Sequence, residues 1–286
     1  MSTFITDFSK HIGEEVTVQG WLYNKRSSGP LYFLEIRDGQ GWTQAVAAKA
    51  GLSSEIWKAI DDAGQESSIK VVGKVAAHPK RPGVFELHVT GFETIQNAVE
   101  YPIALKDHGP DFLLEHRHLW LRSKRQWAIL RIRDAIKTAI HNYLHEQKFI
   151  SVDSPEFTPN ACEGTTTLFA VPYFDLGEAY LSQSGQLYIE AAIASVGRCY
   201  DFGPVFRAEK SKTKRHLTEF WMMDAEAAFV EHDENLSIQE GLARYVIRYC
   251  LDHCQEEFAV LERNVETLKA ADAPFTRYTY DQAIVK

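Results

Sequence analysis

The chain has 286 residues, of which 45% are hydrophobic and 24% are charged, and its formal net charge is -8 at pH 7. These fractions are typical of a globular chain and exclude a disordered or collagen-like protein, and the length is sufficient for two domains. No apolar run is long enough for a membrane-spanning helix, and the N-terminus does not resemble a secretory signal. We therefore expect a soluble, cytoplasmic protein.

The N-terminal part of the sequence predicts short strands and turns, because apolar residues alternate with polar ones between Gly- and Pro-containing turns. The five strands are expected at residues 16–23, 31–37, 42–46, 68–75 and 84–89. A helix is expected over residues 53–63, between the third and fourth strands. This order matches an oligonucleotide-binding barrel, although another small β-barrel or a sandwich would also fit.

The character of the sequence changes after residues 96–110, which contain two prolines and no clear periodicity. We expect a barrel domain over residues 1–98, a linker over 99–110 and a second domain over 111–286. Mixed helices and strands without regular alternation predict an α+β fold with an antiparallel sheet in the second domain.

The elements of the second domain follow from the same patterns. Helices are expected over 123–147 and 185–196 and from near Asn235, extended segments at 149–152, 168–171 and 179–181, and strands at 198–207 and 218–229. The apolar spacing places Leu130 on the buried side of the first helix and Phe258 on that of the last.

The four cysteines include no Cys-x-x-Cys pair, and their spacing offers no complete set of metal ligands. Buried, reduced thiols are the simplest interpretation, and no metal-binding residue is assigned in the chain.

A basic loop is predicted between the last two strands. Residues 204–216 hold five basic residues and one acid, although the chain as a whole is acidic. Several cations in one cleft suit a polyphosphate, because arginine binds phosphate oxygens with a rigid bidentate fork. On charge pattern alone, a solvated basic turn is the alternative.

The surroundings of this loop resemble the second signature motif of the class II aminoacyl-tRNA synthetases that charge aspartate, asparagine and lysine. The match consists of Phe206-Arg207-x-Glu209, the loop, and Arg215-His216-x-x-Glu219-Phe220. Residues 149–156 resemble the first motif, and residues 161–164 and 181–188 resemble the substrate loop and substrate-binding helix of this subgroup. The family carries an anticodon-binding barrel in the position of the first domain.

The resemblance implies a set of site residues. The catalytic residues would be Arg207, Glu209 and His216, and ATP would be bound by these three together with Arg215 and Phe220. The amino acid would be bound by Glu163, Gln183, Gln186 and Glu190, the anticodon by Phe33, Gln44 and Glu86, and Pro155 would lie at a dimer interface. Alternation alone favours a place for Phe33 in the barrel core, and the family resemblance reverses that interpretation. The implied partners are tRNA, ATP and a second copy of the chain, with Mg²⁺ expected alongside ATP.

The amino-acid substrate is suggested by one position. Aspartate enzymes of this family carry a lysine three residues after the second glutamine of Gln-Ser-x-Gln, where this sequence has Ile189 followed by Glu190. An aspartate carboxylate would be repelled by Glu190, whereas an asparagine amide offers it an N–H donor. The pattern resembles the asparagine branch, which forms asparaginyl-adenylate and transfers the amino acid to tRNA(Asn). An enzyme that accepts both aspartate and asparagine is the alternative.

The family's third motif, a glycine-rich segment ending in an arginine for the γ-phosphate, has no counterpart after Glu231. The family's metal ligands would also lie beyond residue 286. We therefore expect an incomplete catalytic domain and little or no asparagine activation by these residues alone, because each lost preorganised charge costs about a hundredfold or more in rate. A tRNA-binding relative without catalysis, and a relative that adenylates a free metabolite, are the remaining alternatives.

Overall fold

The computed structural model describes residues 2–104, 106–162, 167–213 and 215–286. The chain divides into two compact units, Met1–Glu115 and His116–Lys286. The first unit ends with the short helix α2 (Pro110–Glu115). Within the described ranges, no helix combines the length and the apolar character needed to cross a membrane.

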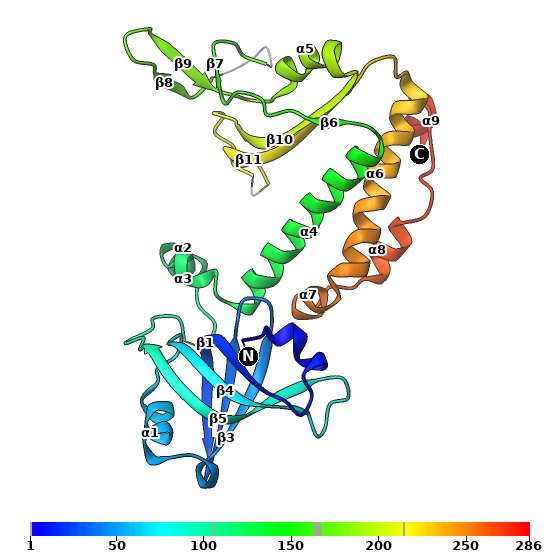
Figure 1. Ribbon diagram of the computed structural model, residues 1–286. Helices are drawn as coiled ribbons and strands as arrows, with labels where there is room; N and C mark the ends of the chain where they lie inside the picture. The colour runs from blue at the N-terminus through cyan, green and yellow to red at the C-terminus, as the bar shows by residue number, and fades with distance from the viewer. Residues whose placement is uncertain (1, 105, 163–166, 214) are drawn as a thin grey trace. The chain divides into compact units, whose positions relative to one another are not determined.

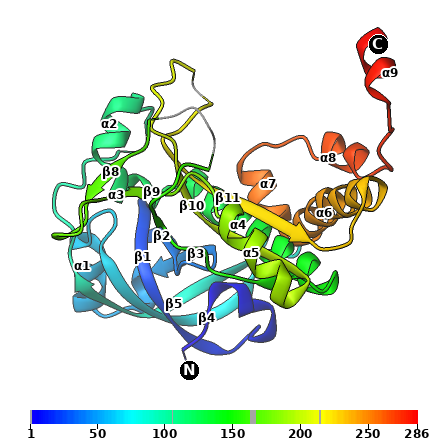
Figure 2. The ribbon, with the colours of Figure 1, turned by 90° about the horizontal axis from the view of Figure 1, so that it is seen from above.

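The first unit is built around a closed barrel with the strand order β1-β2-β3-β5-β4 (Figures 1 and 2). Its elements are η1 (Ile5–Lys10), β1 (Glu15–Ser28), β2 (Leu31–Arg37), β3 (Trp42–Ala48), η2 (Lys49–Gly51), α1 (Ser54–Asp62), β4 (Ser68–Ala77) and β5 (Phe85–Gln96). The five strands, with a helix between the third and the fourth, confirm the barrel expected from the sequence.

The alternation of side chains decides which face of each strand is inside the barrel. Leu34, Ala45 and Leu87 are fully buried, and their strand neighbours point to the outer face. Lys25 joins helix α1 to the barrel, since its Nζ donates to the carbonyl oxygens of Ile60 at 2.8 Å, Asp61 at 2.6 Å and Ala63 at 3.1 Å. A lysine at the C-terminal end of a helix also complements the helix dipole.

A buried ion pair links β2 to the segment before β4. The guanidinium of Arg37 donates to both carboxylate oxygens of Glu66, at 2.8 and 2.9 Å. The two side chains are only 7% and 1% exposed, and the guanidinium lies 5.1 Å from the ring centre of Trp21 and 5.4 Å from that of Trp42. The pair is therefore shielded from water, and neither charge can be left alone without a large cost.

The second unit combines two small sheets with helices (Figure 1). Its elements are α3 (Arg117–Trp120), α4 (Lys124–Glu146), β6 (Ile150–Ser151), β7 (Phe157–Thr158), β8 (Ala170–Pro172), β9 (Glu178–Leu181), α5 (Gln186–Val196), β10 (Arg198–Phe206), β11 (Glu219–Ala227), α6 (His232–His253), α7 (Gln255–Val260), α8 (Glu266–Ala271) and α9 (Tyr280–Val285). In the order β11-β10-β6, β11 is antiparallel and β6 parallel to β10, and β7-β9-β8 is antiparallel. The α+β character expected from the sequence is confirmed.

The hairpin of β10 and β11 packs on helices through both faces. On one face Tyr200 and Met223 contact Tyr143 and Leu144 of α4, which lies beside α6 (Figure 1). Helix α5 packs against the same two strands, and the thiol of Cys199, the neighbour of Tyr200, donates to the carbonyl oxygen of Ile189 at 3.4 Å. Successive residues of a strand point to opposite faces, so α5 covers the face opposite to α4.

Three details differ from the sequence-based expectations. Leu130 is 49% exposed, because Trp127 and Ala128 form the buried surface of that part of α4 instead. Phe258 is buried as predicted, but it lies on α7, since α6 ends at His253 and Cys254 interrupts the helix. The short strand β7 was not predicted from the sequence.

We predict that Glu66→Gln lowers the free energy of unfolding of the barrel by about 3 kcal/mol, because it leaves the charge of Arg37 buried without its carboxylate. The measurement is urea denaturation of the full chain, with hydrogen exchange of barrel amides identifying the transition that belongs to the barrel. Glu93→Gln is the matched control, since Glu93 is 63% exposed and pairs with Lys70 at 3.3 Å on the barrel surface. The control should change the stability by less than about 1 kcal/mol. Equal effects of the two substitutions would contradict the role of burial.

Candidate functional site

The face of β10 and β11 that α5 covers carries a row of carboxyl groups. The antiparallel register places Asp201 opposite Asp224 and Cys199 opposite Glu226. Cross-strand partners project from the same face, so Asp201 and Asp224 stand side by side, an arrangement that is normally destabilising. We call Asp201, Asp224 and Glu226, together with Glu156 before β7, the acid row.

The acid row is electrostatically strained. Burial raises the pKa of Asp201, which is 7% exposed, and the charge of Asp224 raises it further. Burial and the charge of Asp201 raise the pKa of Glu156, whose Oε2 is buried without a hydrogen-bond partner among the described residues. Burial, followed by the charges of Glu190 and Asp224, raises the pKa of Glu226. Clusters of this kind occur at functional sites, and sequence reasoning missed this one.

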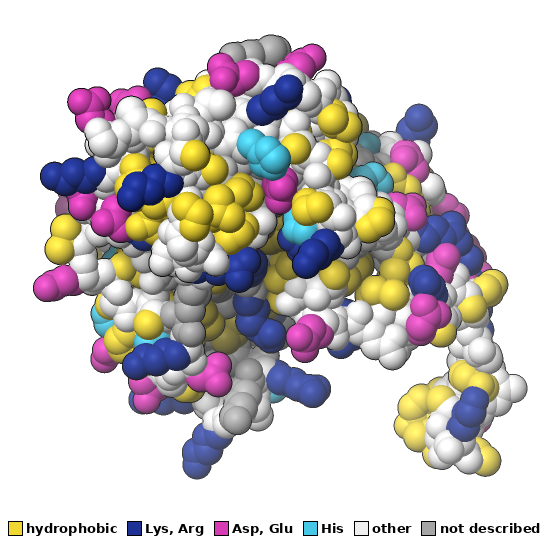
Figure 3. Space-filling model, turned by 90° about the horizontal axis from the view of Figure 1, so that it is seen from below, with side chains coloured by type: hydrophobic (Ala, Val, Ile, Leu, Met, Phe, Trp, Pro, Cys, Tyr) yellow, Lys and Arg dark blue, Asp and Glu magenta, His cyan; other side chains and the backbone are white. Residues whose placement is uncertain are grey.

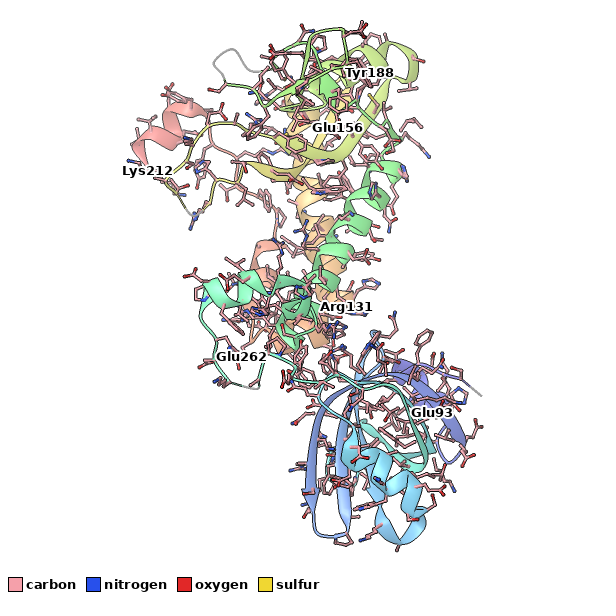
Figure 4. All side chains as sticks on the ribbon, turned by 90° about the vertical axis from the view of Figure 1, so that its left-hand side faces the viewer. Glu93, Arg131, Glu156, Tyr188, Lys212 and Glu262 are labelled. Atoms are coloured by element: carbon pink, nitrogen blue, oxygen red, sulfur yellow. The ribbon has the colours of Figure 1, made fainter. Side chains whose placement is uncertain are left out.

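Two cavities lie around the start of α5. One, of about 240 Å³, is lined by Glu156 and Asp201 of the acid row, and the second, of about 230 Å³, is lined by Ser184, Cys162 and Tyr188 among others. The exposed Pro155, predicted to lie at a dimer interface, borders both cavities. Glu156 and Tyr188 are labelled at this end of the unit in Figure 4.

The described residues predicted to bind the amino acid gather before α5 and within its first two turns. Gln183 is 2% exposed, and its Oε1 accepts the backbone N–H of Cys162 at 3.2 Å. Gln186 Nε2 donates to Glu190 Oε1 at 3.0 Å, which holds that carboxylate beside the acid row. Ile189, at the position where aspartate enzymes of this family carry a lysine, is uncharged and fully buried. Glu163, predicted to belong to this group, lies outside the described residues.

Ser184 connects this group to the acid row. Its hydroxyl donates to Asp224 Oδ2 at 2.7 Å and accepts the backbone N–H of Gln186 at 3.1 Å. One serine therefore holds both the carboxylate of β11 and the start of α5, and the amino-acid group and the acid row form one continuous site.

The residues predicted to bind ATP lie on the β10–β11 hairpin. Arg207 is half-buried where the two strands separate, and its backbone N–H donates to Thr218 at 2.9 Å. Phe220 stands opposite Val205 on the face of the acid row. The loop carries exposed side chains at Glu209, Arg215 and His216, and His216 bonds to the hydroxyl of Thr213. Lys212, labelled in Figure 4, lies on this loop.

The residues predicted to read the anticodon lie on three neighbouring strands of the barrel. Gln44 of β3 stands opposite Glu86 of β5, and its Nε2 donates to Glu86 Oε2 at 3.2 Å. Phe33 of β2 is half-buried, and the guanidinium of Arg26 lies 4.7 Å from its ring centre. Figure 3 shows Lys and Arg side chains beside Asp and Glu side chains on one face of the molecule. Basic side chains that could contact RNA phosphates are therefore present at the surface, although the net charge of the chain is -8.

Family comparison identifies both units. A model of the class II tRNA synthetases for D, K and N matches residues 109–286, and a model of the OB-fold nucleic acid binding domain matches residues 16–95. The chain belongs to the class II tRNA synthetases of the D, K and N group. The barrel is therefore the OB-fold of a class II synthetase, and β10, β11 and α5 belong to its synthetase domain.

Several individual relatives of this chain are named as asparagine enzymes. It is 53% identical over 281 residues to the asparagine–tRNA ligase of Sorangium cellulosum, covering 98% of this chain and 63% of the relative. The asparaginyl-tRNA synthetase of Pyrococcus horikoshii, solved with asparaginyl-adenylate, matches with a TM-score of 0.91 and 36% identity over 100% of this chain and 66% of that one. The chain spans 63% to 65% of the length of the first curated relatives it matches.

We predict that Asp201→Asn stabilises the second unit at neutral pH. Because burial raises the pKa of Asp201, the folded state binds its proton more tightly than the unfolded chain does. The free energy of unfolding therefore falls as the pH rises from the ordinary pKa of aspartate to the raised pKa of Asp201. Above the raised pKa, Asp201 is ionised in the folded state and its burial destabilises the unit in full. Urea denaturation should show a higher midpoint for Asp201→Asn at pH 7, and the advantage should shrink as the pH falls towards 4. The exposed Asp175→Asn is the control, and a lower midpoint for Asp201→Asn would contradict the prediction.

Proposed function

We propose that the chain carries the amino-acid-activating site and the anticodon-binding barrel of an asparagine–tRNA ligase. The observation that carries this proposal is the proximity of the carboxyl groups of Glu190 and Glu226, where the charge of Glu190 raises the pKa of Glu226, beside the buried Ile189 in a chain closely similar to asparagine–tRNA ligases. Glu190 and Glu226, with no cation at position 189, favour the side-chain amide of asparagine as a ligand. They would repel the side-chain carboxylate of aspartate.

The polarity of the site supports asparagine as the substrate. Ionised carboxylates only accept hydrogen bonds, and the side-chain amide of asparagine offers two N–H donors. Aspartate would add a negative charge close to Glu190 and Glu226, in a site where burial already opposes ionisation. The α-ammonium group of either amino acid would be attracted by the same acid row, so the side chain alone decides between the two substrates.

The reaction that fits this arrangement has two steps. The carboxylate of asparagine attacks the α-phosphorus of ATP, which forms asparaginyl-adenylate and releases pyrophosphate. A ribose hydroxyl at the end of tRNA(Asn) then attacks the acyl carbon and releases AMP. Catalysis by this chain would come from alignment and from positive charge on the phosphates, for which Arg207 at the end of β10 is the best placed residue. Phe220 would stack on the adenine, and Glu209, Arg215 and His216, whose side chains are exposed on the loop, would contact the nucleotide.

Mg²⁺ is expected with ATP from the family resemblance. The described residues form no group of three or more His, Cys, Asp or Glu side chains arranged to hold a metal ion. The side chains named above account for binding and alignment of the substrates, and Mg²⁺, when bound with ATP, would add positive charge at the phosphates.

The barrel would recognise the anticodon as single-stranded RNA. Stacking of a base on an exposed aromatic ring, with hydrogen bonds to base edges, is the common mode for such barrels. Phe33 supplies the ring, and Gln44 with Glu86 supplies polar groups two residues further along the sheet face. We further propose, from the family resemblance, that the protein is cytoplasmic and forms a homodimer. Pro155 is exposed and therefore accessible to a second copy at this interface.

We predict that the chain binds a sulfamoyl analogue of asparaginyl-adenylate at least about tenfold more tightly than the aspartyl analogue, which corresponds to about 1.4 kcal/mol. Isothermal titration calorimetry measures both affinities and does not require turnover. Glu190→Gln should narrow the preference by admitting the aspartyl compound, whereas Glu178→Gln, at an exposed position of β9, should leave it unchanged.

Equal or tighter binding of the aspartyl analogue would contradict the assignment of asparagine and favour a relaxed enzyme. Absence of binding by either analogue, with RNA binding retained, would favour a tRNA-binding relative without catalysis. Pyrophosphate exchange measured on the same samples tests the expectation that these 286 residues activate asparagine weakly.

A further inference from the structure

The strand register of the barrel places two rows of side chains across its outer face. The first row is Arg26, Phe33, Val46 and His88, and the second is Asn24, Glu35, Gln44 and Glu86. Both rows cross β1, β2, β3 and β5, and the residues between them on the strands, such as Leu34 and Leu87, are buried in the barrel. Val46 therefore separates Phe33 from His88, and two strand spacings make this distance about 9.5 Å.

His88 is joined to the residues already proposed to read the anticodon. Its Nε2 lies 2.9 Å from Glu86 Oε1, and the other carboxylate oxygen of Glu86 accepts from Gln44 at 3.2 Å. The side chain of Glu86 is 8% exposed, whereas that of His88 is 56% exposed. Glu86 is thus held from two sides, by Gln44 and His88. His88 is much more exposed than Glu86, so a ligand can reach it more easily.

The polarity of His88 follows from its partner. When Glu86 is ionised its carboxylate can only accept, so Nε2 of a neutral His88 carries the proton that is donated to it, and Nδ1 is left as an acceptor. Uracil and guanine present an imino N–H at the centre of their Watson–Crick edge, whereas cytosine and adenine present an acceptor there. An acceptor on the protein therefore favours uracil or guanine over cytosine or adenine.

We propose that His88 is a specificity-determining residue for RNA: it fixes Glu86 and accepts the imino N–H of the base that flanks the base stacked on Phe33. The inference rests on the proposed anticodon-binding function of the barrel and extends it to a residue outside the Phe33, Gln44 and Glu86 set. An asparagine anticodon, 5′-GUU-3′, has an imino N–H donor at both flanking positions, and the aspartate anticodon, 5′-GUC-3′, lacks one at the third.

The test measures dissociation constants of the full chain for anticodon stem-loop RNAs by fluorescence anisotropy at one fixed salt concentration. The loops carry GUU, GUC or AUU, so each flanking base in turn loses its imino donor. The unmodified chain should bind GUU about tenfold more tightly than at least one of the other two loops, which is the size of effect expected from one hydrogen bond. His88→Ala should reduce that ratio to about twofold or less, and His88→Gln, which keeps a donor and an acceptor, should restore part of it.

Two controls separate this inference from the proposed function. Thr90→Ala changes an exposed residue on the same face of β5 outside the two rows, and should leave all affinities unchanged. Phe33→Ala should weaken binding to all three loops. If Phe33→Ala has no effect, the proposed RNA-binding face itself is wrong. If Phe33→Ala weakens binding but His88→Ala keeps the preference, or weakens all loops equally, the role of His88 is contradicted and the barrel assignment stands.

Discussion

The antiparallel pairing of β10 with β11 forces two aspartates, Asp201 and Asp224, to stand side by side in a poorly solvated part of the second unit. Like charges at such positions destabilise a sheet, so the surrounding structure has to offset them. Ser184 donates to Asp224, and the backbone at Gly185 approaches Asp201 so closely that an added Cβ would lie 1.4 Å from its Oδ2. The turn before α5 is thus shaped around the carboxylates, and a substrate carrying N–H donors would relieve the remaining repulsion.

Negative and positive side chains occupy different parts of the β10–β11 hairpin. Negative charge is concentrated where the strands pair beneath α5, and positive charge follows from Arg207 onward, where the strands separate into the loop. This polarity matches an amino acid joined to a nucleotide, since the ammonium and amide groups need acceptors and the phosphates need donors. The overall charge of -8 says little about either end. What matters is the order of the charges along one hairpin.

Much of this architecture could be predicted from the sequence, and the remainder depends on contacts between distant segments. Period-two alternation identified the strands of the barrel, and the loop between two apolar strands marked the hairpin that carries Arg207. The acid row could not be read in the same way, because Asp201 meets Asp224 only through the strand register. His88 was missed for the same reason, since its contact with Glu86 matters only once β3 places Gln44 on the other side. Leu130 fits the helical period but is exposed, because periodicity does not show where a partner surface ends.

The central claim is that the acid row and the basic loop form the two ends of one site for an aminoacyl-adenylate. A crystal structure of the chain with the sulfamoyl analogue of asparaginyl-adenylate tests it most directly. We expect the asparagine amide nitrogen within hydrogen-bond distance of the carboxylate of Glu190 or Glu226, and the sulfamoyl group on the side of Arg207. An analogue bound in the opposite direction, with its adenine over the acid row, would contradict the account.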